Sequence, residues 1–179
     1  PIERILLISR NNGEGFAVMT LLCSLIEFLQ TIYTGQYYSN NKADTNNYKY
    51  GNSESGKIVR DFLTEHEPFK THFTKKNIDG KTFAEDFYSN VRCGLLHEAA
   101  TGGNWVIKVA KDEVTKDFVD LNDESNKIIY RNLFYKTLRD YVTAYKNDVL
   151  KDEKKLRNAL CRKFDKLCEI DSANEPWWA

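Results

Sequence analysis

A long apolar run, from Phe16 to Tyr33, is the feature that most constrains the fold of this chain: FAVMTLLCSLIEFLQTIY. A helix that is apolar nearly all round belongs either in a protein core or in a membrane. Glu27 and Gln30 interrupt the run, and no cluster of basic residues flanks it. The sequence therefore predicts a buried helix over residues 16–34, at the centre of the core, and no membrane segment.

Further helices are predicted where apolar residues recur at intervals of three and four. They cover residues 57–66, 81–100, 132–150 and 152–168. In the last of these helices the side chains expected to face inward are Leu156, Leu160, Phe164 and Leu167. Charges of alternating sign between them indicate a solvated outer face.

Two segments lack a helical period. Residues 35–56 are rich in Asn, Tyr, Ser and Gly and predict a long loop, whose tyrosines either pack it onto the domain or stack on bases. Residues 104–130 contain two short runs with strand composition, 104–110 and 126–130. The predicted fold class is mainly α: a single domain over residues 1–179, a bundle of four to five helices, with a small β-hairpin insertion at 104–130 and a C-terminal helix and tail at 152–179.

Charge and cysteine content narrow the function classes. Lys plus Arg and Asp plus Glu number 26 each, so no global basic field indicates a nucleic-acid-binding protein, and any RNA contact must rest on a local patch. The four cysteines form no C-x-x-C pair, which favours reduced thiols in a cytoplasmic protein. His66 and His72 lack the spacing of metal ligands and are expected in a solvated loop. We expect no metal and no cofactor.

Arg92 and His97 are the strongest candidates for catalysis. Both lie in VRCGLLHEA, within the predicted helix 81–100. A histidine can take a proton from a ribose 2′-hydroxyl or give one to a leaving 5′-oxygen near neutral pH. An arginine can bind two oxygens of a phosphate that gains negative charge. The pair is therefore a minimal set for cleaving RNA without a metal ion. A buried, hydrogen-bonded histidine in an ordinary helix is the alternative, since so short a pattern often arises by chance.

Helical geometry limits how this pair can act. Residues five apart on a straight α-helix differ by about 140° around its axis, so Arg92 and His97 do not share a face. Gly94, between them, permits a distortion or a close helix approach. A symmetric dimer would bring the Arg and His of both chains into one cleft.

The stretch FYSNVRCGLLHEA, with helical aromatics before it and glycines after it, resembles the signature helix of the HEPN superfamily, small helical domains with an Arg-x₄₋₆-His motif. The resemblance covers about residues 82–103; elsewhere it is one of architecture. It implies a metal-independent endoribonuclease whose site forms across a homodimer. Such domains occur in toxin–antitoxin, abortive-infection and CRISPR-associated systems.

Three neighbours of the pair are expected to support it. The family often has a polar residue after the arginine, where this chain has Cys93, and we expect Asn90 to supply that polar contact. Glu98 is expected to orient the site or to pair with an arginine; otherwise it is simply an exposed helix residue.

The leading hypothesis is thus a HEPN-type ribonuclease of a toxin or phage-defence system. Its expected partners are RNA, a second copy of the chain and an antitoxin or sensor protein. The alternatives are a non-catalytic HEPN-like dimeric module that binds RNA, a nucleotide or a protein, and a structural helical protein in which His97 belongs to the core.

Overall fold

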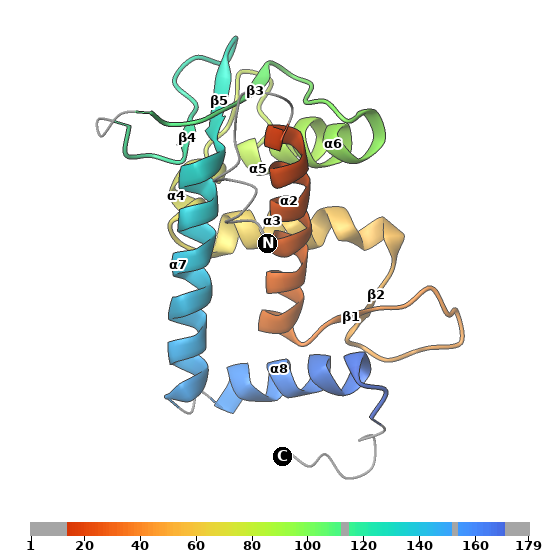
Figure 1. Cartoon of the computed structure of the whole chain (residues 1–179). Coiled ribbons are helices and arrows are strands. Elements are labelled where there is room, and N and C mark those ends of the chain that lie inside the picture. Colours follow the sequence, from red (N-terminus) through yellow and green to blue (C-terminus); the bar gives the residue numbers. More distant parts are fainter. Residues whose placement is uncertain (1–13, 112–114, 152–153, 171–179) are drawn as a thin grey trace.

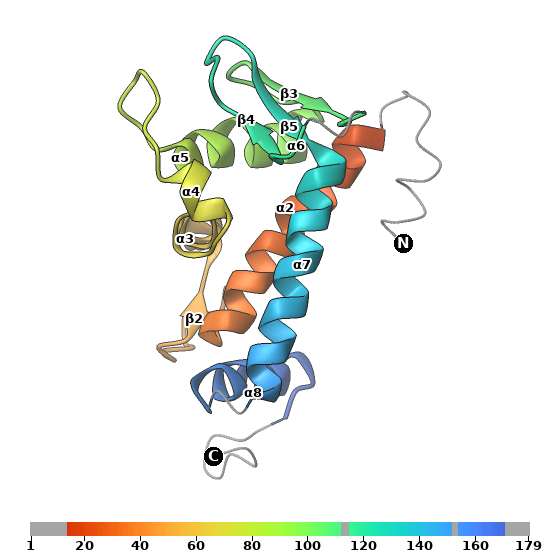
Figure 2. The ribbon, with the colours of Figure 1, turned by 90° about the vertical axis from the view of Figure 1, so that its left-hand side faces the viewer.

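The computed structural model describes residues 14–111, 115–151 and 154–170. Two long helices, α2 (Glu14–Thr34) and α7 (Arg131–Leu150), run side by side in the same direction (Figures 1 and 2). Helix α3 (Ser55–Glu65) crosses α2, and α8 (Lys154–Leu167) crosses the far end of both long helices. The mainly α fold predicted from the sequence is confirmed. The predicted tail at 171–179 lies outside the described residues.

Helix α2 is the centre of the core, as predicted, but only part of its circumference is covered. Val18, Met19, Leu22 and Ile26 are fully buried. They pack with a cluster of phenylalanines from the surrounding elements, Phe62, Phe69, Phe73, Phe87, Phe118 and Phe134. The opposite face of α2 remains open, because Leu21 is 45% exposed and Phe28 is 43% exposed.

The predicted helix 81–100 consists of three pieces. An α-helical turn, α5 (Phe83–Phe87), leads into a π-helical turn, η2 (Tyr88–Arg92), and then into α6 (Cys93–Glu98). Thr82 and Glu85 cap its start reciprocally, since each side chain accepts a hydrogen bond from the other residue's backbone N–H. It ends at Ala99, which adopts the left-handed conformation at φ 52°.

A three-stranded sheet follows α6, with the strand order β3 (Trp105–Lys108), β5 (Lys127–Tyr130), β4 (Val119–Asp120). The predicted β insertion is thus present, but its two predicted strands pair in parallel and form no hairpin with each other. More than a dozen residues join them, which is the length that a parallel connection needs. The hairpin is made by β4 and β5, which pair antiparallel.

The loop of residues 35–56 packs against the domain. Its ends pair through β1 (Tyr37–Tyr38) and β2 (Lys49–Tyr50), and a short 3-10 turn, η1 (Asn52–Glu54), leads into α3. Tyr37 and Tyr50 are each 6% exposed, which supports the packing interpretation for these two tyrosines.

The expectation of a solvated loop at His66 was wrong. His66 is buried, and its ring nitrogens bond Gln30 at 2.9 Å and the Tyr141 hydroxyl at 3.2 Å. It follows Phe62 by one helical turn, so it continues the inward face of α3. A short helix that the sequence did not predict, α4 (Phe69–Phe73), comes directly after it and buries both its terminal phenylalanines.

The expectation for the inner face of α8 was only partly correct. Leu156 and Leu160 pack partly against the core, but Phe164 is 54% exposed and Leu167 is 59% exposed. The helix touches the end of α2 around Gly35, where an added Cβ would lie 3.0 Å from the Ala159 backbone. After Ala159 the inward positions of the helix are taken by Lys163 and Asp165, which are buried, so Phe164 and Leu167 lie on its exposed side.

Candidate active site

Arg92, the last residue of η2, is held by a partner from a distant part of the chain. Its Nη2 donates a hydrogen bond to Glu27 Oε2 on α2 at 3.2 Å, and the two side chains are 17% and 20% exposed. Burial is the largest single influence and lowers the pKa of Arg92, but the hydrogen bond to Glu27, the Glu27 charge and the neighbouring Tyr88 and Cys93 together raise it above its ordinary value. A guanidinium has five N–H donors, so one bond to Glu27 leaves capacity for a phosphate.

An aromatic ring supports the same guanidinium. The Cζ of Arg92 lies 5.5 Å from the centroid of the Tyr88 ring, within cation–π range. Tyr88 itself is fixed by α3: its hydroxyl lies 3.4 Å from Ser55 Oγ, and its ring touches the backbone of Gly56 so closely that a Cβ there would come within 2.9 Å of it. A second guanidinium, that of Arg60, lies 5.7 Å from the ring centroid.

The π-helical turn places Arg92 in this position. The Cys93 N–H bonds the Tyr88 carbonyl, five residues back, so the helix contains one residue more than α geometry would. Short π-helical bulges of this kind are frequent at functional sites. The distortion ends at Arg92, however, and α6 is regular. The separation of about 140° between Arg92 and His97 therefore remains.

Gly94 permits a close approach, but of the chain that follows α6 and not of a neighbouring helix. A Cβ on Gly94 would lie 2.6 Å from the Ala100 carbonyl oxygen, so the glycine lets the chain fold back over the end of α6. It leaves the angle between Arg92 and His97 unchanged, and no neighbouring helix contacts it at this distance.

His97 stands at the exposed end of α6. No hydrogen bond or ion pair joins its imidazole to another described residue, in contrast to His66. The reading of His97 as a core histidine is therefore wrong. The ring is accessible to a substrate or to a second chain.

The three supporting residues are placed differently. The Asn90 amide donates to Asp86 Oδ1 at 2.6 Å, and the Asn90 carbonyl accepts from the Gly102 N–H at 2.8 Å, so Asn90 anchors the turn after α6. Cys93 is half-buried with a free thiol, and Glu98 is exposed without a bond to Arg92. The partner that sequence reasoning missed is Glu27, whose only signal was a charge inside an apolar run.

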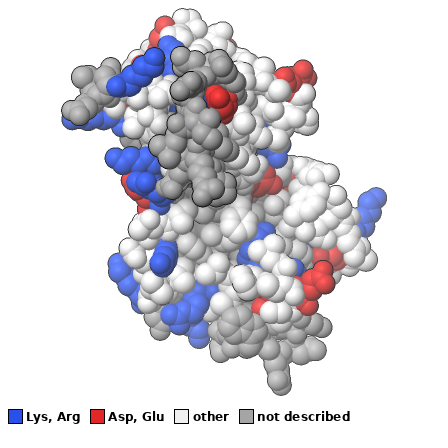
Figure 3. Space-filling model, in the orientation of Figure 1, with Lys and Arg blue, Asp and Glu red and all other residues white. Residues whose placement is uncertain are grey.

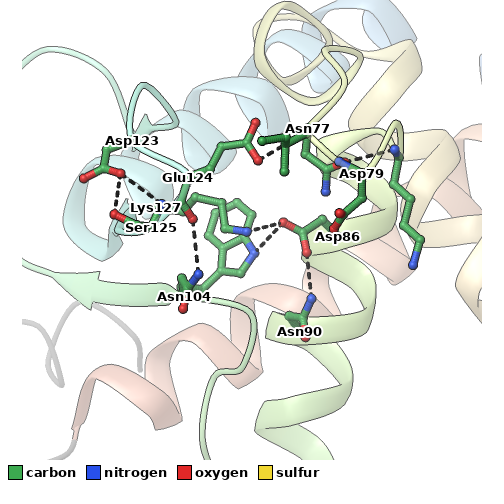
Figure 4. Close-up of polar contacts among 12 residues, drawn as sticks. Asn77, Asp79, Asp86, Asn90, Asn104, Asp123, Glu124, Ser125 and Lys127 are labelled. Atoms are coloured by element: carbon green, nitrogen blue, oxygen red, sulfur yellow. Dashed lines mark hydrogen bonds and ion pairs between the residues drawn. The ribbon is translucent and has the colours of Figure 1, made fainter.

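A buried polar cluster ties the motif segment to the sheet (Figure 4). Asp86 on α5, 7% exposed, accepts hydrogen bonds from Lys127 Nζ at 2.7 Å and from Trp105 Nε1 at 3.1 Å, besides the one from Asn90. Lys127 is 5% exposed. The three donors come from β5, β3 and η2, so one carboxylate fixes the β insertion on the segment that contains Arg92.

Glu27 also interacts with polar groups of the loop 35–56 and of α8. The Tyr50 hydroxyl donates to Glu27 Oε1 at 3.4 Å, and burial together with the Glu27 charge raises the pKa of Tyr50 to about 12. Burial likewise lowers the pKa of Lys163 on α8, and the charge of Glu27 opposes that shift. The loop 35–56 and α8 thus converge on the carboxylate that holds Arg92.

Within the described ranges, no group of three or more His, Cys, Asp and Glu residues is arranged to hold a metal ion. Helix α2 is long and apolar enough to cross a membrane by length and composition, with half of its most apolar window buried in the structure, and buried core helices share those properties.

Comparison of the chain with protein-family models, with curated proteins and with solved structures finds no match.

Proposed function

We propose that the protein is a metal-independent endoribonuclease of HEPN type in which Arg92 and His97 act on RNA. The observation that carries the proposal is the π-helical turn Tyr88–Arg92, which places the partly exposed guanidinium of Arg92 over the ring of Tyr88. The exposed imidazole of His97 one turn further on supplies a group that can move a proton.

The proposed reaction needs no other reagent. The 2′-oxygen attacks the adjacent phosphorus while His97 takes the hydroxyl proton, and the bond from phosphorus to the 5′-oxygen breaks as a proton is returned to that oxygen. The products are a 2′,3′-cyclic phosphate and a 5′-hydroxyl. Arg92 stabilises the extra negative charge on the phosphate oxygens.

A second copy of the chain is part of the proposal. Because Arg92 and His97 diverge by about 140°, one chain alone does not direct both at a single phosphate. Leu96 follows Arg92 by one helical turn and is 45% exposed, and Leu21 and Phe28 are exposed on the neighbouring α2. Such side chains favour a homodimer through α2 and α6, in which Arg92 meets His97 of the partner subunit.

The ion pair between Glu27 and Arg92 favours a second candidate function. A guanidinium already paired inside its own chain suits a non-catalytic dimeric module that binds RNA, a nucleotide or a protein. The two candidates differ in turnover: only the nuclease releases a cyclic phosphate. The role in toxin or phage-defence systems and an antitoxin or sensor partner are proposed from the family resemblance alone, and the cytoplasmic setting is proposed from the cysteine pattern.

The test is incubation of the purified protein with several single-stranded and structured RNAs in EDTA. We expect cleavage with 2′,3′-cyclic phosphate ends, lost in Arg92→Ala and in His97→Ala. Arg139→Ala is the matched control, because that arginine is exposed on α7, away from the motif. Intact RNA in every reaction, with RNA binding retained, would overturn the nuclease and support the non-catalytic module.

A further inference from the structure

Helix α8 concentrates positive charge in a chain that is neutral as a whole. Its sequence KKLRNALCRKFDKL holds six Lys and Arg residues against one Asp. Lys154, Lys155 and Lys166 are exposed. Acidic residues bound this stretch in the sequence, at 152–153 and at Glu169. In Figure 3, several Lys and Arg side chains lie at the lower left of the molecule, on the side where α8 begins in Figure 1.

The cations of α8 lie against aromatic rings of the loop 35–56. The Arg162 guanidinium is centred 3.5 Å from the Tyr48 ring centroid, and Lys166 Nζ lies 4.7 Å from the Tyr37 ring centroid. Tyr48 is 39% exposed and Tyr38, next to Tyr37, is 47% exposed. The Tyr37 ring is buried, but those of Tyr38 and Tyr48 are accessible, and cations beside accessible rings bind single-stranded nucleic acid, since phosphates meet the cations and bases stack on the rings.

A buried lysine, Lys163 at 7% exposure, connects α8 with the candidate site. Lys163 of α8 lies with its Nζ 6.0 Å from the ring centroid of Phe28, and its charge interacts with Glu27, the next residue along α2. Glu27 in turn holds Arg92. Helix α8 therefore neighbours the residue that holds Arg92, so a strand with one phosphate at Arg92 has the cations of α8 next in its path.

We infer that α8 and the exposed tyrosines of the loop, Tyr38 and Tyr48, form the surface that binds the backbone of single-stranded RNA beyond the cleaved phosphate. RNA as the ligand rests on the proposed function; the surface itself rests on the contacts above. The substrate it fits is an extended strand that spans both Arg92 and α8.

The test measures binding of a labelled 20-nucleotide oligouridine to the full chain carrying His97→Ala, which prevents cleavage during the measurement. The triple variant Lys154→Ala, Lys155→Ala, Lys166→Ala is compared with Lys70→Ala, Lys75→Ala, Lys76→Ala, three lysines that are also exposed and lie around α4. We expect the α8 variant to lose affinity on the order of tenfold or more. Its salt dependence, as the slope of log K against log salt, should lessen by about 2, at about 0.7 for each lost phosphate contact. The α4 variant should keep both values.

Each result distinguishes RNA binding at this surface from the alternative explanations. Equal affinity and equal slope in the two triple variants would overturn the inference. The inference would also be overturned if the parent protein bound anionic phosphatidylserine vesicles through the α8 lysines but did not bind oligouridine. The exposed Phe164 and Leu167 beside the lysines would then mark a lipid-binding helix. Lysine-dependent oligouridine binding by a protein that cleaves no RNA would uphold this surface and reject the proposed nuclease, so the two failures are distinguishable. Thermal unfolding of both variants confirms that they fold.

Discussion

The two ends of the Arg92–His97 segment are built in opposite ways. The Arg92 end is held from three sides: by Glu27 on α2, by Tyr88 wedged against α3, and by the Asp86 cluster that reaches the sheet. The His97 end is exposed and stops one residue later at a left-handed turn. The chain thus fixes the cation in advance, whereas the orientation of the imidazole is left to a substrate or a second chain.

The largest effect is expected from His97→Ala. Loss of a proton-transfer group should slow RNA cleavage about 10²–10⁴-fold. Because the ring contacts no described polar group, urea unfolding should be unchanged. Single-turnover cleavage and urea denaturation measure the two quantities. A variant that loses stability along with activity would show that the His97 end is structurally anchored after all.

Asp86→Ala tests how firmly the Arg92 end of the segment is anchored. It leaves Lys127 charged and buried without its carboxylate, which costs about 3–5 kcal/mol of folding free energy. Adding Lys127→Met should recover much of that loss. The matched control is Lys57→Ala, which breaks an exposed pair with Asp61 and should cost below about 1 kcal/mol. Similar losses in the buried and exposed variants would contradict the special role of the Asp86 cluster.

Gly94 lies between the two ends of the segment, and Gly94→Ala should lower the folding stability. Alanine usually gains about 1 kcal/mol over glycine inside a helix. Here its Cβ would meet the Ala100 carbonyl oxygen at 2.6 Å, so backbone must move and we expect a net loss of about 1–2 kcal/mol. Gly51→Ala is the control, since its nearest neighbours stand 3.9 Å away. Chemical denaturation of both variants gives the comparison; a stabilised Gly94→Ala protein would contradict the close approach.

The smallest effect concerns His66, which is buried. Burial lowers the pKa of His66 below its ordinary 6.5, so the unfolded chain binds a proton that the folded chain resists. Its contribution to stability is complete above pH 6.5 and is lost as the pH falls toward 5, with a slope of at most about 1.4 kcal/mol per pH unit. In urea unfolding between pH 7 and 5, His66→Gln should flatten this dependence. An unchanged pH dependence in this variant would refute the assignment.

The sequence predicted those parts of the fold that depend on local periodicity. Apolar spacing located α2, α3 and α7 and the core residues Phe83, Phe87, Val91 and Leu95. It could not predict the π-helical turn, because Phe87, Val91 and Leu95 keep the same spacing of four across it. The pairing of β3 with β5 depends on contacts between distant segments, so the local pattern of each run suggested a hairpin just as well.

The candidate site shows the same limit. Arg92 and His97 were found as residue types in a short motif, and His97 is accessible as that motif requires. The partner of Arg92 lies 65 residues earlier in the chain, and no local pattern links the two. Asn90 was expected to supply the polar contact usual after the arginine, but its amide bonds Asp86, four residues earlier, because residues four apart lie on the same face of a helix. Charge counted over the whole chain likewise concealed the basic side chains of α8.

The π-helical turn has a consequence for how this chain should be aligned with any relative. A π-helical bulge is in effect a one-residue insertion that the helix absorbs without a loop. A homologue with a continuous α-helix would lack one residue between Tyr88 and Arg92, and its residues before that point would match this chain only after a single gap. An alignment without the gap would pair Arg92 with the wrong neighbour, about 100° around the helix, and the Arg-x₄-His motif would lose its register with Glu27.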